Sequence, residues 1–214
     1  QKDSVEYELK GESHVFRNFI ANLEKVAKAN SRVLITGSSG SGKEVSARYI
    51  HDNSNQSSGN FIAINCSVSD QDELERMLFG LETSDSLIEV GALEKANGGT
   101  IFLDEVSEIP LHLQGKLLKA LVEKSLTRFG GNTEVDINFR VISSTNVDLS
   151  EKIYEKKFRE DLFHRLNVVP IKTPNLSERV DDIPILAKYF AEKLASDNGL
   201  TNRKFTTEAL TFLQ

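Results

Sequence analysis

A glycine-rich turn carries the residues of this chain that are best suited to chemistry. It consists of Gly37, Ser38, Ser39, Gly40, Ser41, Gly42 and Lys43. The turn follows the apolar run Val33 to Ile35 and precedes a segment, Glu44 to Ile50, that favours a helix. Glycines permit a tight turn that points several N–H groups into one concavity, and Lys43 adds a charge that can reach the outer phosphates of a nucleotide. This context favours nucleotide binding over the alternative, a flexible linker between two elements.

Two acids supply a second chemical centre. Asp104 and Glu105 directly follow the apolar run Thr100 to Leu103, so both carboxylates are expected at the carboxyl edge of a parallel sheet, beside the glycine-rich turn. There Asp104 would hold magnesium through its water shell, and Glu105 would orient and polarise an attacking water. The alternative is that the two acids only cap the next segment. Glu44 makes the metal role of Asp104 more important, since phosphate loops generally have Ser or Thr at that position to contact magnesium.

Apolar runs alternate with segments of helical periodicity, which predicts an α/β fold with a five-stranded parallel sheet between helices. The expected strands are Arg32–Thr36, Phe61–Asn65, Thr100–Asp104, Phe139–Ser144 and Val168–Ile171. The expected helices are His14 onward with Ser13 as its N-cap, Glu44 to about His51, Asp70–Phe79, Pro110 to about Lys124, Ile183–Asp197 and Thr206 onward. We expect residues 1–10 to be a linker, residues 11–174 the nucleotide-binding part, and residues 175–214 the start of a small helical lid.

Composition argues against several classes of protein. The 214 residues carry a net charge of −6, which argues against nucleic-acid binding by this segment alone. No apolar stretch reaches membrane-spanning length and no signal peptide is visible, so we expect a cytoplasmic protein without membrane contact. The single cysteine, Cys66, cannot form an internal disulfide, and its place at the end of a strand favours a buried thiol over a reactive one. Because the chain opens with Gln1, we expect it to be a piece of a longer protein.

The order of these motifs resembles the AAA+ ATPase domain of bacterial enhancer-binding proteins, the NtrC-like activators of sigma-54 RNA polymerase. Nearly the whole chain takes part in the resemblance. The matching segments are Gly37–Glu44, Phe61–Cys66, Leu78–Gly80, Asn97–Glu105 and Phe158–Pro170. This family also has Glu after the lysine of its phosphate loop. The resemblance implies a P-loop AAA+ core that binds ATP with magnesium.

The resemblance also implies roles for three polar residues at strand ends. Asn65 would hydrogen-bond Glu105 and hold it away from water until the nucleotide state changes; the alternative is a strand-end asparagine that satisfies a turn. Thr145 and Asn146 resemble the family's sensor motif, which reads the γ-phosphate.

Arg159 and Arg165 match the family's arginine fingers. They lie six residues apart in a stretch expected to be helical, and a surface salt bridge is the alternative for either. A finger acts on the ATP of the neighbouring subunit, so these residues imply self-association into a head-to-tail, hexamer-like ring.

The chain departs from the sigma-54 activators between Leu81 and Gly91. That interval is shorter and acidic, and it lacks the Gly-Ala-Phe-Thr-Gly-Ala loop of those activators. We expect Leu87 and Ile88 to pack against the neighbouring helix rather than project. This departure, with the segments Gly91–Ala96 and Leu176–Pro184, is similar to the NtrX branch of response regulators. The chain also stops before the family's lid segment with its sensor arginine, and it includes neither a receiver domain nor a DNA-binding helix-turn-helix.

Three hypotheses follow. The first is a Mg-dependent ATPase module of an NtrX-like two-component response regulator, weak in isolation, in which DNA is bound by another domain and RNA polymerase is a partner. The second is a nucleotide-gated assembly module without productive hydrolysis, and the third is a conventional sigma-54-dependent activator. An AAA+ protein unrelated to transcription would explain the motifs but not the match over Phe158–Pro170.

Overall fold

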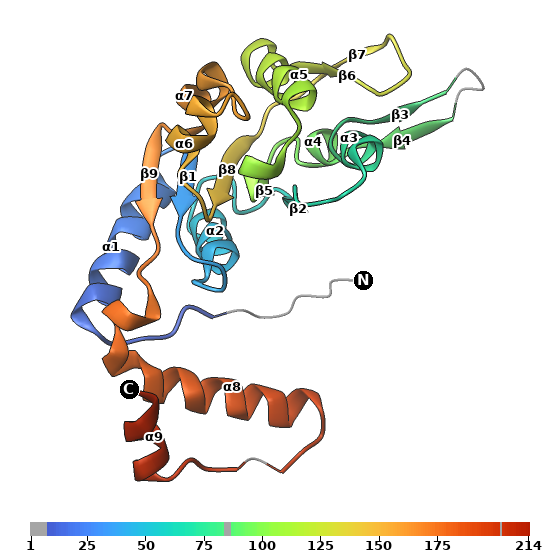
Figure 1. Ribbon diagram of the computed structural model, residues 1–214. Helices are drawn as coiled ribbons and strands as arrows, with labels where there is room; N and C mark the ends of the chain where they lie inside the picture. The colour runs from blue at the N-terminus through green and yellow to red at the C-terminus, as the bar shows by residue number, and fades with distance from the viewer. Residues whose placement is uncertain (1–7, 84–86, 202) are drawn as a thin grey trace.

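A computed structural model describes residues 8–83, 87–201 and 203–214 of the chain. Its centre is a sheet of five strands in the order β2-β5-β8-β1-β9 (Figure 1). The strands are β1 (Val33–Thr36), β2 (Phe61–Asn65), β5 (Thr100–Asp104), β8 (Arg140–Thr145) and β9 (Val169–Lys172). All four pairings between neighbours are parallel. The expected five-stranded parallel sheet is confirmed, and each strand lies within one residue of its predicted bounds.

Helices cover both faces of this sheet. They are α1 (His14–Lys28), α2 (Lys43–Asp52), α3 (Gln71–Phe79), α4 (Ala92–Lys95), α5 (Leu111–Glu123), α6 (Leu149–Tyr154) and α7 (Glu160–Leu166). Two further helices, α8 (Ile183–Asp197) and α9 (Thr207–Leu213), follow β9 and lie away from the sheet (Figure 1). Val33 and Ile35 join a buried cluster with α1 and α2, whereas Leu34 joins a second cluster with α3, α5 and α7. Successive strand residues therefore enter opposite layers. Burial on both sides explains why the strands are continuous apolar runs.

The strand order decides where the carboxyl ends of the strands meet. β1 lies between β8 and β9, with Thr36 opposite Thr145. β5 lies on the other side of β8, with Leu103 opposite Ser143. The segments that leave β1, β8 and β5 therefore emerge side by side at one edge, where open α/β sheets bind their ligands.

Two antiparallel hairpins project together from the α3 and α5 side of the sheet (Figure 1). One pairs β3 (Gly80–Glu82) with β4 (Ile88–Val90), and the other pairs β6 (Ser125–Thr127) with β7 (Glu134–Asp136). The amide of Glu82 donates to the carbonyl of Phe129 at 2.9 Å, and the amide of Phe129 donates to the carbonyl of Gly80 at 3.1 Å. These bonds join the two hairpins into one unit.

The expectation that Leu87 and Ile88 pack against a helix is wrong. Leu87 is 62% exposed and Ile88, in β4, is 53% exposed. The chain after α3 folds back on itself as a hairpin, so its short strands satisfy one another and leave these side chains facing solvent. Ser84, Asp85 and Ser86 lie outside the described residues.

Cys66 is fully buried, so the expectation of a buried thiol is confirmed. Burial raises the pKa of the Cys66 thiol to about 12, with smaller contributions from the charges of Asp104 and Glu105. Within the described part of the chain, no helix is both long and apolar enough to span a membrane.

A buried ion pair fastens the segment before α1 to the segment before α8. Asp182 is fully buried, and its Oδ1 accepts hydrogen bonds from the amides of Glu12 at 2.6 Å and Ser13 at 2.8 Å. Its Oδ2 accepts from the Ser13 hydroxyl at 2.7 Å and pairs with Arg179 Nε at 2.9 Å. The Arg179 guanidinium also lies over the ring of Phe16, 4.0 Å from its centroid. The Asp182 carboxylate thus connects the segment before α1 to the segment before α8, although the two are far apart in sequence.

We expect Asp182→Ala to lower the free energy of unfolding by about 3 kcal/mol, because it leaves the largely buried charge of Arg179 without its carboxylate partner. Urea unfolding followed by circular dichroism measures this loss. Asp181→Ala is the matched control: Asp181 is exposed, so its loss should stay within about 0.5 kcal/mol. Equal losses in the two variants would contradict the role given to this ion pair.

The same ion pair has a pH dependence. Burial by itself would raise the pKa of Asp182, but hydrogen bonds from Glu12 and Ser13 and the charge of Arg179 outweigh it and lower the pKa below its usual value. Its stabilisation is therefore present above the ordinary pKa of an unfolded carboxyl group and is lost as pH falls through the lowered folded-state pKa. The difference between the unaltered chain and Asp182→Ala should shrink over that acid range.

Candidate functional site

The phosphate loop connects the end of β1 to the start of α2, and its glycines are required for two different reasons. Gly40 and Gly42 have φ of 74° and 93°, in the region that favours glycine. At Gly37 the reason is space, because a Cβ there would lie 1.9 Å from Thr173 Oγ1. The loop therefore packs tightly where it leaves β1 and is open around its tip, where a Cβ on Gly40 would contact nothing within 4 Å.

Neighbouring strands hold the loop in place. The Gly37 amide donates to the carbonyl of Thr145 at 3.3 Å, which ties the loop to the end of β8. The hydroxyls of Ser41 and Thr173 lie 2.7 Å apart, and the Ser38 hydroxyl donates to Asn175 Oδ1 at 2.7 Å. Ser39 is exposed. Residues after β9 thus support the loop, a contribution that no sequence motif indicated.

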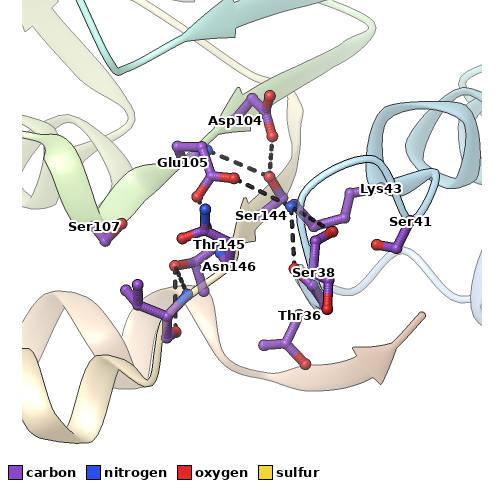
Figure 2. Close-up of polar contacts among 12 residues, drawn as sticks. Thr36, Ser38, Ser41, Lys43, Asp104, Glu105, Ser107, Ser144, Thr145 and Asn146 are labelled. Atoms are coloured by element: carbon purple, nitrogen blue, oxygen red, sulfur yellow. Dashed lines mark hydrogen bonds and ion pairs between the residues drawn. The ribbon is translucent and has the colours of Figure 1, made fainter. Parts of the chain in front are cut away.

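Lys43 joins the phosphate loop to Glu105, the residue that follows β5 (Figure 2). Its Nζ donates to the carbonyls of Gly37 at 3.1 Å and Ser38 at 3.4 Å. The same Nζ lies 3.1 Å from Glu105 Oε1. Only 7% of the Lys43 side chain and 15% of the Glu105 side chain are exposed, so water screens this pair weakly.

Glu105 adopts a conformation that non-glycine residues rarely take. Its φ is 55° and its ψ is 56°, a left-handed geometry that costs about 1 kcal/mol. This turn lets the side chain reach both Lys43 and the amide of Asn146, which donates to Glu105 Oε2 at 3.0 Å. Such outliers cluster at functional sites, where the surrounding structure maintains them. The glutamate thereby links the loop after β1 to the end of β8.

Asp104 is held by a residue that the sequence did not single out. The hydroxyl of Ser144, on β8, donates to Asp104 Oδ1 (Figure 2). Two adjacent serines, Ser143 and Ser144, in a strand expected to be buried were the available signal, because a buried hydroxyl needs a partner. Beside these acids lies a hollow of about 380 Å³, lined by Ser67, Val68, Ser69, Glu105, Glu108 and Asn146.

Asn65 has the geometry of the structural alternative. Asn65 lies opposite Asp104 in the sheet register, yet its Oδ1 accepts a hydrogen bond from the amide of Ser67 at 2.9 Å, as in a strand-end turn. Among the described residues, no hydrogen bond joins Asn65 to Glu105, whose two oxygens bind Lys43 and Asn146 instead. The switch role of Asn65 stays a prediction.

Arg159 is not inside a helix, as the sequence suggested, but is the N-cap of α7 with extended backbone angles. The reason is a tertiary contact: its amide donates to Oε1 of Gln114, in α5, at 2.8 Å rather than to a helical carbonyl. Its guanidinium is 46% exposed and pairs with Asp161 at 2.8 Å. This contact is the surface salt bridge of the alternative interpretation.

Arg165 lies in α7 and its Nη2 donates to the carbonyl of Leu121 at 3.4 Å. Its Nε is buried and has no hydrogen-bond partner among the described residues. α7 leads into the start of β9, while the phosphate loop follows the opposite end of the parallel neighbour β1 (Figure 1). The structure therefore brings together five predicted site residues at the carboxyl ends of the strands: Lys43, Asp104, Glu105, Thr145 and Asn146. Arg165 lies near the opposite, amino ends of the strands.

Glu44 pairs with Arg48 one helical turn later, at 3.0 Å. Among the described residues, no cluster of three or more His, Cys, Asp or Glu side chains could hold a metal by itself. Magnesium commonly uses one or two carboxylates together with nucleotide phosphates and water. Asp104 beside a phosphate loop fits that mode of binding.

Comparison with known proteins gives the family. Residues 9–172 match the sigma-54 interaction domain. The chain belongs to the sigma-54 interaction domain family.

NtrX is prominent among the relatives in this family. The nitrogen assimilation regulatory protein NtrX of Azorhizobium caulinodans is 43% identical over 205 residues, which are 95% of this chain and 45% of that protein. A crystal structure of NtrX from Brucella abortus is 42% identical, with a TM-score of 0.92 over 95% of this chain and 47% of that chain. The same protein in complex with ATP gives a TM-score of 0.89 over 96% of this chain and 47% of that chain. The chain spans about half the length of these relatives.

The tight packing at Gly37 yields a test of the loop geometry. We expect Gly37→Ala to destabilise the chain by about 1–3 kcal/mol, because the new Cβ overlaps Thr173. In a chain that also carries Thr173→Ala, the same substitution should cost at least about 1 kcal/mol less. Thermal or urea unfolding of the double-mutant cycle measures this coupling.

Gly40→Ala is the control, because its Cβ would meet nothing within 4 Å. We expect it to cost only the backbone strain of a positive φ, about 1 kcal/mol, with no coupling to Thr173. Purely additive effects at Gly37 and Thr173 would contradict the close approach.

Proposed function

We propose that this chain is the ATP-binding, Mg-dependent ATPase and self-assembly module of an NtrX-type two-component response regulator. The observation that carries the proposal is the bridge from Lys43 to Glu105 and on to the Asn146 amide. It connects a phosphate loop, an acid that could activate water, and a strand end that could sense the γ-phosphate. The ATP complex of the NtrX relative from Brucella abortus supports the choice of nucleotide.

In this proposal each element around the site has one task. The N–H groups of residues 37–43 and the N-terminus of α2 bind phosphate oxygens, and Lys43 neutralises the β- and γ-phosphates. Asp104 would hold magnesium through its water shell, where the ion would supply positive charge beside the phosphates. Glu105 orients the attacking water, and Thr145 with Asn146 detects whether the γ-phosphate is present.

The pair of Lys43 and Glu105 would be rearranged by the nucleotide. Lys43 donates to two loop carbonyls and faces Glu105 in this structure. A bound phosphate offers Lys43 a stronger partner, since hydrogen bonds between ions are about twice as strong as neutral ones. Glu105 would then be freed for water or for Asn65, which would leave its turn at Ser67. This exchange gives the predicted switch a physical route.

Arg159 and Arg165 would act on the ATP of a neighbouring copy. α7 and the phosphate loop are associated with opposite ends of the paired strands β9 and β1, which favours action in trans over action in cis. A head-to-tail, hexamer-like ring would bring α7 of one copy to the loop of the next. The exposed pair of Arg159 with Asp161 could exchange for a phosphate at little cost, because exposed ion pairs contribute about 1 kcal/mol or less.

We further propose that the whole protein binds DNA through another domain and regulates transcription by its position and assembly, without remodelling sigma-54 polymerase. The acidic interval between Leu81 and Gly91, with no Gly-Ala-Phe-Thr-Gly-Ala loop, supports this. A second candidate function is conventional sigma-54 activation. It is favoured by one observation, the exposure of Leu87 and Ile88 on a projecting hairpin, because partner surfaces engage exposed apolar anchors.

Two substitutions test the nucleotide site. Lys43→Ala should weaken ATP binding by at least about tenfold, since it removes a charged hydrogen-bond donor to the phosphates. Glu105→Gln should bind ATP as tightly or more tightly, because it removes a negative charge that holds Lys43, and it should abolish hydrolysis. Calorimetry and phosphate release measure the two effects. Equal loss of binding in both variants would show that Glu105 has been given the wrong role.

The dependence of ATP turnover on protein concentration tests whether Arg159 and Arg165 act as arginine fingers. If they act in trans, ATP turnover per chain rises with protein concentration, and the isolated chain is mostly monomeric and a weak ATPase when dilute. Arg165→Ala should remove the rise without weakening ATP binding. Turnover per chain that stays constant over a hundredfold range of concentration, about 1 to 100 μM, would argue against fingers that act between copies.

An in vitro transcription assay on a sigma-54 promoter separates the two candidate functions. The proposal expects the full-length protein to bind ATP and DNA but not to support open complexes. ATP-dependent open complexes with the unaltered protein would favour the second candidate. Replacing Leu87 and Ile88 with serine should then abolish them.

A further inference from the structure

Ser144 contacts both acids of the site, although no motif points to it. It lies fully buried on β8, next to β5 in the sheet. Its hydroxyl donates to Asp104 Oδ1 and at the same time accepts a hydrogen bond from the Glu105 amide at 3.3 Å (Figure 2). A serine hydroxyl has one proton to donate and two lone pairs, so these two bonds are compatible.

The first of these bonds fixes a carboxylate that has few other constraints. Among the described residues, Ser144 is the one side chain that hydrogen-bonds the Asp104 carboxylate. The general phosphate loop also offers a Ser or Thr hydroxyl to the metal, but this chain has Glu44, which pairs with Arg48. A metal therefore depends more on Asp104 here, and Ser144 is the side chain that orients Asp104.

The second bond supports the unusual backbone at Glu105. β5 ends at Asp104, so the amide of Glu105 lies just beyond the paired residues of the sheet, and Glu105 itself has the left-handed φ of 55°. Without Ser144 this amide would lose the acceptor that it has in the turn. A buried donor that loses its acceptor costs about 1–3 kcal/mol, comparable to the strain that the turn already carries.

We propose that Ser144 is a positioning residue for metal-nucleotide binding: it fixes the rotamer of Asp104 and the turn at Glu105, so that one carboxylate faces the metal and the other faces Lys43. This inference rests on the proposed function and names a further residue for that same site. Ser144 itself contacts neither nucleotide nor water in the reaction. It affects metal-nucleotide binding only by positioning Asp104 and Glu105.

Ser143 offers a matched control. It is the preceding residue on the same strand, it is also fully buried, and its hydroxyl donates to the carbonyl of Val33 at 3.3 Å. Ser143→Ala and Ser144→Ala therefore remove the same atom from the same strand at the same depth. Only the second removes contacts with the acids.

The first experiment uses the nucleotide-free chain. Hydrogen exchange at the Glu105 amide, measured by NMR, should accelerate by about tenfold in Ser144→Ala, because the amide loses its acceptor. Ser143→Ala should leave the Glu105 amide unchanged. Equal exchange rates at Glu105 in the two variants would overturn the proposed support of this turn.

The second experiment measures ATP affinity by calorimetry with Mg²⁺ and with EDTA. The gain in affinity from Mg²⁺ should fall by about fivefold in Ser144→Ala and remain unchanged in Ser143→Ala, while affinity in EDTA is similar in all three proteins. An unchanged gain in Ser144→Ala would overturn the part of the proposal that concerns Asp104. An unaltered chain that does not bind ATP would contradict the proposed function instead, and the exchange experiment would still decide the geometry around Ser144.

Discussion

The ion pair between Lys43 and Glu105 is the interaction on which the rest of the site depends. Both side chains are largely buried, and burying a charge costs several kcal/mol unless it is paired and hydrogen-bonded. Here the carbonyls of Gly37 and Ser38 satisfy the lysine, and the amide of Asn146 satisfies the glutamate. Any ligand that takes one partner away must therefore leave the other to find a new one. In the proposed function a phosphate anion does this, and the pair would thereby couple occupancy of the loop to the position of Glu105.

The sheet explains why this coupling includes the end of β8. The phosphate loop follows β1 and the acids follow β5, and β8 lies between them. The pair therefore spans the carboxyl end of β8, where Thr145 accepts a hydrogen bond from the Gly37 amide and Ser144 holds Asp104. A movement of the phosphate loop or of the two acids would therefore displace the residues at the end of β8. Its position between the two neighbours supports the proposal that this strand end senses the nucleotide.

The sequence allowed the sheet to be predicted, because strands buried on both faces are continuous apolar runs. It also allowed the meeting of the glycine-rich loop with the two acids to be predicted, because both lie at the carboxyl ends of parallel strands. The hairpins were missed, since three-residue strands have no periodicity to detect, and Leu87 and Ile88 were consequently expected to be buried. The two serines of β8 indicated only that a buried hydroxyl needs a partner; that Ser144 contacts both acids depends on the neighbours that the fold gives it. The partners proposed for Asn65 and Arg159 depend on a nucleotide and a second copy, which a single chain does not contain.

One crystal structure of this chain with Mg²⁺ and a non-hydrolysable ATP analogue tests the central claim most directly. The account predicts that Lys43 Nζ leaves Glu105 and the loop carbonyls and lies within hydrogen-bonding distance of a β- or γ-phosphate oxygen, while the Glu105 carboxylate turns toward solvent or Asn65. A structure in which the nucleotide is bound and the pair of Lys43 with Glu105 is still intact would contradict it.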